Sequence, residues 1–386
     1  MMKIGVVANE FFDRRLGRMG GFGWAARQVA RCFNADPSLG DRVVLLTNDP
    51  HVLAYRSEAL VHGARLLHIR PNRPEDLFRL ESEQISLLLF IDYRPNYRFF
   101  AEALPHTPLI VWVRDPRTPE DMAKIGSLRL PDAPDTPPKG IMAVNCTSLG
   151  AVVQASRERG RPVLFASPAP HLITRIPGTY RVALDELHLL PNIIDIEPGE
   201  VTKSTHPQVV FLSRLDPIKR PWLMLELAQR FPDVEFLMLG QSHFQGQGGW
   251  MPSAVPANVH FLGHLGEAEK VRALASAWLL INTAIHEGLA ISFLEALACE
   301  TPILSCQDPG GVVSTFGAYV GQLDGAGLEG IPRFAEALGR LLRDHETRQQ
   351  LGKEGRRWVE QTHSRTRFLE AFHAGCLRLG VSHHLA

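Results

Sequence analysis

The chain lacks an excess of charge of either sign and contains few cysteines. Its 386 residues include 41 Lys and Arg and 41 Asp and Glu. Because proteins that bind nucleic acid need a broad basic surface, we expect no nucleic-acid partner. The five cysteines are scattered and form no CxxC pair. Such a set indicates reduced thiols in the cytoplasm, and neither a disulfide framework nor a zinc site.

Long apolar runs are also missing. No run approaches the ~20 apolar residues of a transmembrane helix. The run at the N-terminus, Ile4 to Ala8, is followed at once by polar residues and is too short for a secretory signal. We therefore expect a cytoplasmic protein, and peripheral contact with a membrane stays open.

Common metal and nucleophile motifs are absent as well. The sixteen histidines show no metal-ligand spacing, and neither GxSxG nor a Walker A sequence occurs. His286-Glu287 is not a zinc motif, because HExxH would need histidine where Ala290 stands. We expect no bound metal and no resident cofactor.

What the chain does contain is an alternation of apolar strand-like runs with helical segments, which restarts after a polar linker at 197–207. This pattern predicts an α/β fold with two Rossmann-like parallel-sheet domains, 1–196 and 197–365, and a cleft between them. The expected strands are 3–9, 42–48, 64–69, 85–92, 108–114, 141–146, 163–166, 187–191, 208–212, 235–239, 260–262, 278–285 and 301–305.

A long segment from Asp115 to Lys139 carries four prolines near its end. We expect it to be irregular and to lie on the ligand side of the first domain, since it follows the carboxyl end of a strand. Together with Arg14, Arg15 and Arg18 it would form a basic surface for an anionic acceptor. An ordinary solvated loop explains these arginines equally well.

Two acids mark the stretch on which the functional interpretation depends. Glu287 follows an apolar strand-like run, and Glu295 lies eight positions later in an alanine-rich helical run. Backbone N–H groups at Leu289, Ala290 and Ile291 would be free at the start of that helix and favour an anion. Carboxylates beside an anion site suit a nucleotide sugar, which carries hydroxyls and phosphates. The plainer interpretation, a loop acid and a helix-dipole acid, is commoner for either one alone.

Cations follow the first strand of the second half. Arg214 and Lys219 flank a tight turn and could grip a diphosphate through charge-assisted hydrogen bonds of ~1.5–3 kcal/mol each. A solvated loop is an equally good interpretation.

A glycine loop at Gly20 and Gly21 precedes the first helix. Residues 21–26 fit GxGxxA, but about a dozen residues separate them from the strand, so we reject a dinucleotide fingerprint. The loop could contact a phosphate or sugar through its backbone, although a flexible loop is the stronger interpretation when it is taken alone.

Taken in order, these features resemble the GT-B glycosyltransferases, and among them the retaining family 4. The resemblance spans nearly the whole chain and is strongest from Val209 to Gly311. The matching motifs are Gly20-Gly21, Leu190 to Asp195 (the family's PNGVD), Ser213-Arg214 with Lys219, Glu287 to Glu295 followed by ALACETP, and Gly310-Gly311.

The resemblance implies a role for each matching residue. The implied activity is that of a hexosyltransferase that moves a sugar from a UDP- or GDP-sugar to a hydroxyl acceptor (a glycan, a lipid or a small molecule) without a metal. A C-terminal helix, 366–386, would pack back on the first domain. Arg214 and Lys219 would hold the diphosphate, Glu295 the ribose and Glu287 the transferred sugar, and Arg214, Lys219 and Glu287 would be the catalytic residues. Backbone contacts to the donor would come from Gly20, Gly21, Gly288, Leu289, Ala290 and Ile291.

The chain departs from the family pattern at four positions. Ser213, Ala290 and Glu300 replace glycines, and Arg114 stands near where the family often has a histidine that contacts the donor sugar. Two alternatives stay open: a sugar-nucleotide epimerase or hydrolase on the same fold, and an inactive GT-B protein that binds a nucleotide sugar or a partner.

Overall fold

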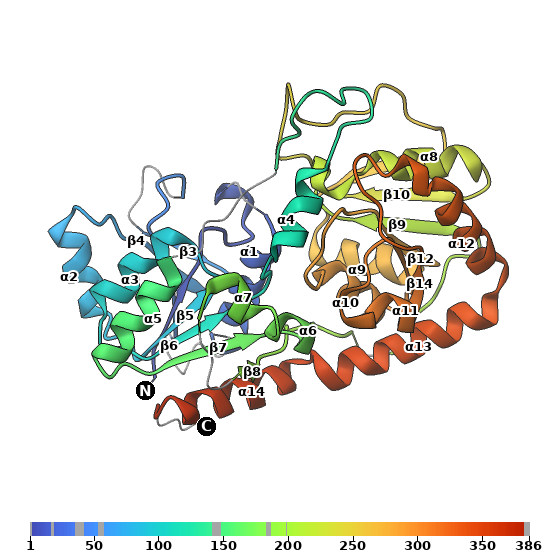
Figure 1. Cartoon of the computed structure of the whole chain (residues 1–386). Helices are drawn as coiled ribbons and strands as arrows, with labels where there is room; N and C mark the ends of the chain where they lie inside the picture. Colours follow the sequence, from blue (N-terminus) through green and yellow to red (C-terminus); the bar gives the residue numbers. More distant parts are fainter. Residues whose placement is uncertain are drawn as a thin grey trace. The chain divides into compact units, whose positions relative to one another are not determined.

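The computed structural model describes two compact units. The first contains residues 1–118, 144–193 and 365–386, and the second contains 119–143 and 194–364. Each has an α/β fold with its own core (Figure 1). The described residues are 2–16, 19–34, 42–52, 58–140, 148–182, 187–197 and 199–381.

The sheet of the first unit has the strand order β3-β4-β2-β1-β5-β6-β7-β8. Its pairings are parallel except that between β3 and β4. The central strands are almost entirely apolar because helices cover both faces. The strand predicted at 141–146 lies outside the described residues. The strands are β1 (Ile4–Val7), β2 (Val43–Thr47), β3 (Glu58–Val61), β4 (Ala64–His68), β5 (Leu87–Ile91), β6 (Leu109–Trp112), β7 (Val163–Ser167) and β8 (Leu187–Leu189).

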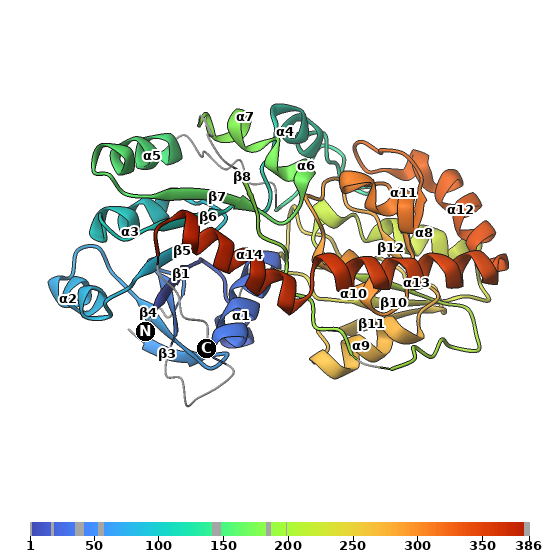
Figure 2. The same cartoon turned by 90° about the horizontal axis from the view of Figure 1, so that it is seen from below.

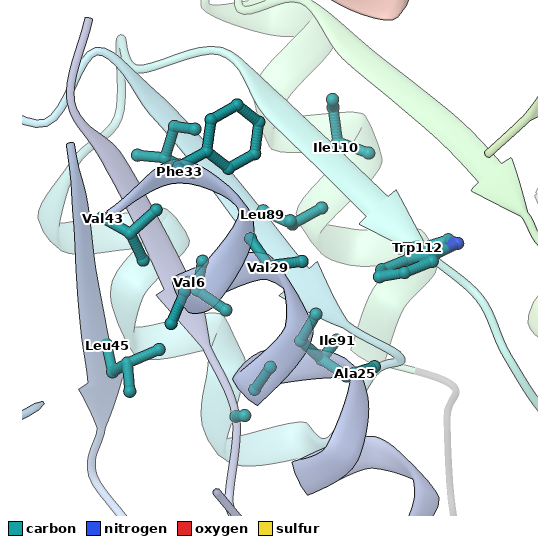
Figure 3. Close-up of a cluster of buried hydrophobic side chains, with 14 of the residues drawn as sticks. Val6, Ala25, Val29, Phe33, Val43, Leu45, Leu89, Ile91, Ile110 and Trp112 are labelled. Atoms are coloured by element: carbon teal, nitrogen blue, oxygen red, sulfur yellow. The ribbon is translucent and has the colours of Figure 1, made fainter. Parts of the chain in front are cut away.

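Helices α1 (Gly21–Phe33) and α14 (Arg365–Arg378) lie over one face of this sheet (Figure 2). Val29 and Phe33 of α1 pack on apolar side chains of the strands beneath (Figure 3). Phe368 of α14 joins the same core, with its ring centroid 5.6 Å from that of Trp112. The C-terminal helix is thus part of the first unit. The other elements are η1 (Arg14–Leu16), α2 (Pro74–Ser82), η3 (Pro95–Tyr97), α3 (Arg98–Ala103), α5 (Ser148–Glu158), α6 (Pro170–Ile173) and α7 (Ile176–Tyr180).

The second unit has a parallel sheet in the order β11-β10-β9-β12-β13-β14. Along the chain this is the order 3-2-1-4-5-6 of doubly wound folds, so the connections change direction between β9 and β12. Its strands are β9 (Gln208–Leu212), β10 (Glu235–Leu239), β11 (Val259–Gly263), β12 (Leu279–Asn282), β13 (Ile303–Ser305) and β14 (Gly317–Tyr319).

Helices cover both faces of the second sheet, with α8 and α12 on one side and α9, α10 and α13 on the other (Figure 1). None of the described helices, in either unit, is both long and apolar enough to cross a membrane. The elements are α4 (Pro119–Gly126), η4 (Pro217–Lys219), α8 (Trp222–Arg230), α9 (Glu267–Ser276), α10 (Ile291–Ala298), η5 (Pro309–Gly311), α11 (Val312–Phe316), η6 (Leu328–Gly330), α12 (Ile331–Arg343) and α13 (His345–Thr362).

The segment after Asp115 corrects two predictions. It contains a helix, α4, and from Pro119 onward it belongs to the second unit rather than the first. Pro119 is the first residue of α4, where a missing N–H costs nothing, and the four prolines near the end of the segment come after the helix. Ile125, Leu128 and Leu130 are buried in the second core, and this burial decides where the segment packs.

The segment from Pro119 onward therefore does not belong to the basic surface predicted for the first domain. Arg14 and Arg15 lie in the first unit, and Arg15 is paired with Asp13 at 2.6 Å. Arg18 lies outside the described residues.

Candidate functional site

The predicted donor residues of the second unit follow two neighbouring strands. Strand β9 leads into the turn with Arg214 and Lys219, and β12 leads into the loop with Glu287. The two strands pair in parallel, with Val210 opposite Leu280, so both loops leave the same edge of the sheet. This edge is the point where the strand order reverses, which is where open α/β sheets bind their ligands.

Lys219 and Glu287 form a direct ion pair. The Lys219 Nζ lies 2.7 Å from the Glu287 Oε1, which also accepts a hydrogen bond of 2.9 Å from the Asn282 Nδ2. The side chains of Lys219 and Glu287 are 17% and 9% exposed, so the pair is largely but not fully desolvated. This contact joins Lys219, which is predicted to hold the diphosphate of a donor, to Glu287, which is predicted to hold the transferred sugar.

Arg214 lies on the same turn with more of its side chain open. Its Nη1 is 3.2 Å from the Oδ2 of Asp216, and its side chain is 37% exposed. Asp216 is fully buried, and its Oδ1 accepts a hydrogen bond from the His243 N–H. The guanidinium is therefore anchored at one nitrogen and can present the others to a ligand.

Gly240 allows the β10 loop to approach this turn. Its φ is +135°, and a Cβ built there would lie 1.9 Å from the carbonyl oxygen of Ser213. Only glycine fits this position, because both the backbone angle and the contact exclude a side chain.

Arg220 holds the turn and the loop together. It is fully buried and adopts a left-handed conformation with φ 46°. Its guanidinium donates hydrogen bonds to the carbonyl oxygens of Thr283, Ala284 and Leu323 at 2.8–3.0 Å. Burial lowers the pKa of Arg220 below its usual value. The sequence offered no signal for this residue, since one arginine in a polar turn resembles any other.

The helix that follows Glu287 begins at Ile291, with Ala290 as its N-cap. No side chain caps this end, so the first N–H groups remain available to an anion. Ala290 has φ −65°, which alanine adopts without strain, so replacing the family's glycine costs no backbone energy here.

Glu295 lies in the second turn of α10. Its Oε1 is 2.6 Å from the Nζ of Lys270 on α9, and the same Nζ is 3.0 Å from the Oε1 of Glu267. The sequence had not singled out Lys270. The only sequence feature that marks Lys270 is the alternation of Glu and Lys at the start of this helix.

His286 precedes Glu287 and is buried. Its Nδ1 lies 3.4 Å from the Asp121 Oδ1, which ties α4 to the β12 loop. In the part of the chain that the structure describes, no group of three His, Cys, Asp or Glu side chains could hold a metal ion.

In the first unit, the glycine loop contacts an acid of its own domain. Gly20 is the N-cap of α1, and the Phe22 N–H donates to the Glu10 Oε1 at 3.2 Å. A Cβ on Gly20 would lie 2.6 Å from the Glu10 Oε2, so the glycine makes room for this carboxylate.

Arg114 is buried in the first unit and does not belong to a surface patch. Its Nη2 donates to the Asn192 Oδ1 at 2.6 Å, and its guanidinium lies 4.5 Å from the centroid of the Trp112 ring. Burial lowers the pKa of Arg114 to about 10, and the nearby charges of Asp92 and Glu10 oppose that shift.

Glu300 follows α10 and has φ 52°, a left-handed conformation that glycine adopts more easily. We expect Glu300→Gly to stabilise the second unit by about 0.5–1 kcal/mol, because relief of left-handed strain exceeds the entropy that glycine gains when unfolded. The ion pair between Glu300 and Arg356, at 4.0 Å, is too long to contribute much to the wild type. Urea unfolding measures the change.

The matched control is Glu336→Gly, at an exposed position inside α12. It should cost about 1 kcal/mol, as glycine does inside a helix. Equal destabilisation by both substitutions would contradict the strain at Glu300.

Part of this chain is similar in sequence to known proteins. Residues 193–358 match the family described as glycosyl transferases group 1. The chain is 31% identical over 170 residues to a GDP-mannose-dependent monoacylated alpha-(1-6)-phosphatidylinositol monomannoside mannosyltransferase of Corynebacterium glutamicum, covering 40% of this chain and 43% of that protein. It is 30% identical over 110 residues to a D-inositol 3-phosphate glycosyltransferase of Mycolicibacterium gilvum, covering 25% and 24%. The matches span less than half the length of either relative.

Solved structures match over nearly the entire chain. Sucrose-phosphate synthase from Thermosynechococcus elongatus superposes with a TM-score of 0.69 at 16% identity, covering 99% of this chain and all of that one. HepE from Anabaena, solved with UDP-glucose, gives 0.66 at 15% identity, covering 98% and 100%. The fold class predicted from the sequence is confirmed.

Proposed function

We propose that this chain is a retaining family 4 glycosyltransferase. It has a GT-B fold, and its residues 193–358 match the family described as glycosyl transferases group 1. It transfers a sugar from a nucleotide-diphosphate sugar to a hydroxyl acceptor. The observation that carries the proposal is the placement of Arg214, Lys219 and Glu287 at the reversal point of the second sheet, beside the uncapped start of α10.

The proposed chemistry follows from charge. Breaking the sugar–phosphate bond leaves negative charge on the diphosphate. Arg214, Lys219 and the first N–H groups of α10 supply fixed positive charge where it develops, which is the largest source of rate enhancement in many enzymes. With this set we propose that no metal is required.

Glu287 and Glu295 then recognise the hydroxyl groups of the donor. The Lys219–Glu287 ion pair gives Lys219 one partner that persists when the diphosphate leaves, so the lysine keeps its position between turnovers. Glu287 can accept from a hydroxyl of the transferred sugar while it remains bonded to Asn282.

For the substrates we propose a UDP- or GDP-sugar donor and an acceptor that carries phosphate. A structural neighbour is solved with UDP-glucose, and the names of the two relatives specify GDP-mannose, a phosphatidylinositol mannoside and an inositol phosphate. We place the protein in the cytoplasm, where these nucleotide sugars are donors, with peripheral membrane contact if the acceptor is a lipid.

A thermal-shift screen with UDP, GDP, ADP and their sugars tests the donor. A nucleotide that binds only the folded protein at 100 times its Kd should stabilise it by about 2.7 kcal/mol and raise the Tm by on the order of 5 °C. If none of these nucleotides changes the Tm, the proposal is wrong.

Turnover then separates the proposal from its two alternatives. Release of nucleoside diphosphate only when an acceptor is present supports a transferase. Release or conversion without an acceptor would indicate a hydrolase or an epimerase. Tight binding with no turnover on any acceptor would indicate a binding protein.

A further inference from the structure

Lys270 is a buried cation outside the residues to which the proposed mechanism assigns a role. It lies on α9 and its side chain is 11% exposed. Lysine is rarely buried unless it is paired, and here its Nζ contacts both Glu295 at 2.6 Å and Glu267 at 3.0 Å. Burial alone would lower the pKa of Lys270, but the two carboxylates outweigh it and raise the pKa, so the ammonium stays charged.

The ion pair leaves one oxygen of Glu295 for a ligand. Lys270 binds Oε1, and among the described residues Oε2 receives no hydrogen bond. The Glu295 side chain is 13% exposed, and Oε2 is not one of the fully buried polar atoms that lack a partner, so a ligand can reach this oxygen although most of the residue is covered. A glutamate held in this way has lost its rotamer freedom before a ligand arrives, so binding the ligand does not have to supply that entropy.

We propose that Lys270 is a positioning residue for nucleotide recognition: it fixes the Glu295 carboxylate so that Oε2 accepts hydrogen bonds from the ribose hydroxyls. This inference rests on the proposed function. Without Lys270, two carboxylates that share one nitrogen would repel each other, and Glu295 would turn away from the ligand. A positioned acceptor discriminates strongly against an analogue that lacks the hydroxyl.

The experiment compares two ligands by titration calorimetry: the nucleoside diphosphate that the wild type binds and its 2′,3′-dideoxy analogue. We expect Lys270→Met to weaken the ribonucleotide 10–100-fold and to change the Kd of the dideoxy analogue by less than twofold. Lys270→Arg, which keeps the charge, should restore at least half of the binding free energy that Lys270→Met removes. Lys353→Met, at an exposed position on α13, is the matched control and should change neither ligand.

A double-mutant cycle with Glu295→Gln completes the test. If Lys270 acts through Glu295, the two substitutions together should weaken the ribonucleotide no more than Glu295→Gln alone. Equal weakening of both ligands, or additive effects, would overturn the inference. Should Lys270→Met not fold, Lys270→Gln, which removes the charge but keeps a polar side chain, carries the test, and an unchanged preference for the ribonucleotide in that variant overturns the inference. Failure of the wild type to bind any nucleoside diphosphate would instead refute the proposed function.

Discussion

Replacing Arg214 or Lys219 by alanine should lower turnover by on the order of 10²–10³, the cost of losing one preorganised donor at a developing charge. Each cation lies on the turn after β9, and each already has an acidic partner within 3.2 Å. These partners hold the cations at the sheet edge before a donor binds. The loss should therefore appear in kcat and in kcat/KM together, since the interaction strengthens as the sugar–phosphate bond breaks.

Single-turnover assays with the donor identified by the thermal-shift screen would measure this loss. Arg357→Ala and Lys353→Ala are matched controls, because both residues are exposed on α13. Both controls should keep the turnover of the parent, and the circular dichroism of all four variants should be unchanged. Turnover within tenfold of the parent in both site variants would refute the proposed roles.

The two cations should differ in one respect. Lys219→Ala leaves Glu287 with a charge that has no ammonium beside it, whereas Arg214 contacts the acid of a neighbouring turn residue. Adding Glu287→Gln to Lys219→Ala should therefore recover little turnover but should restore part of the stability that Lys219→Ala removes.

The sequence predicted the fold well because both sheets consist of short apolar runs separated by turn residues. Strands β9 and β10 have the predicted bounds, 208–212 and 235–239. The strands it did not predict, β3 and β14, are three or four residues long, and β3 is mostly exposed, so neither has an apolar run to detect.

The error at α4 has a different cause. Four prolines suggested an irregular segment, and its position after a strand suggested the first domain. The apolar residues that decide its place, Ile125, Leu128 and Leu130, find their partners in the second unit. Partners so far away in the chain cannot be read from local composition.

Individual site residues were predicted, whereas their pairing was not. Spacing indicated Lys219 and Glu287, but the 2.7 Å contact between them joins residues 68 positions apart. Lys270 and Arg220 were missed for the same reason: each acquires its role from contacts that depend on the strand order. The sequence motifs predict residues that would touch a ligand, and the structure adds the residues that contact their side chains or loops.

Arg220→Met should destabilise the second unit by on the order of 4 kcal/mol, because it leaves several buried carbonyl groups without donors at about 1–3 kcal/mol each. Those carbonyls belong to the β12 loop and to the segment after β14. Hydrogen exchange should consequently accelerate in peptides from β9 and β12. Arg230→Met, at the exposed end of α8, is the matched control and should change stability by less than about 0.5 kcal/mol.

The same substitution should also affect the site, because Arg220 joins the turn of Lys219 to the loop of Glu287. Methionine fills a similar volume but donates no hydrogen bond, so the two loops should separate even where the variant stays folded. Donor affinity should then fall at temperatures well below the Tm, while Arg230→Met keeps the affinity of the parent. A variant with full affinity and parental exchange in β12 would mean that sheet packing alone holds the site, and that the buried guanidinium contributes nothing to it.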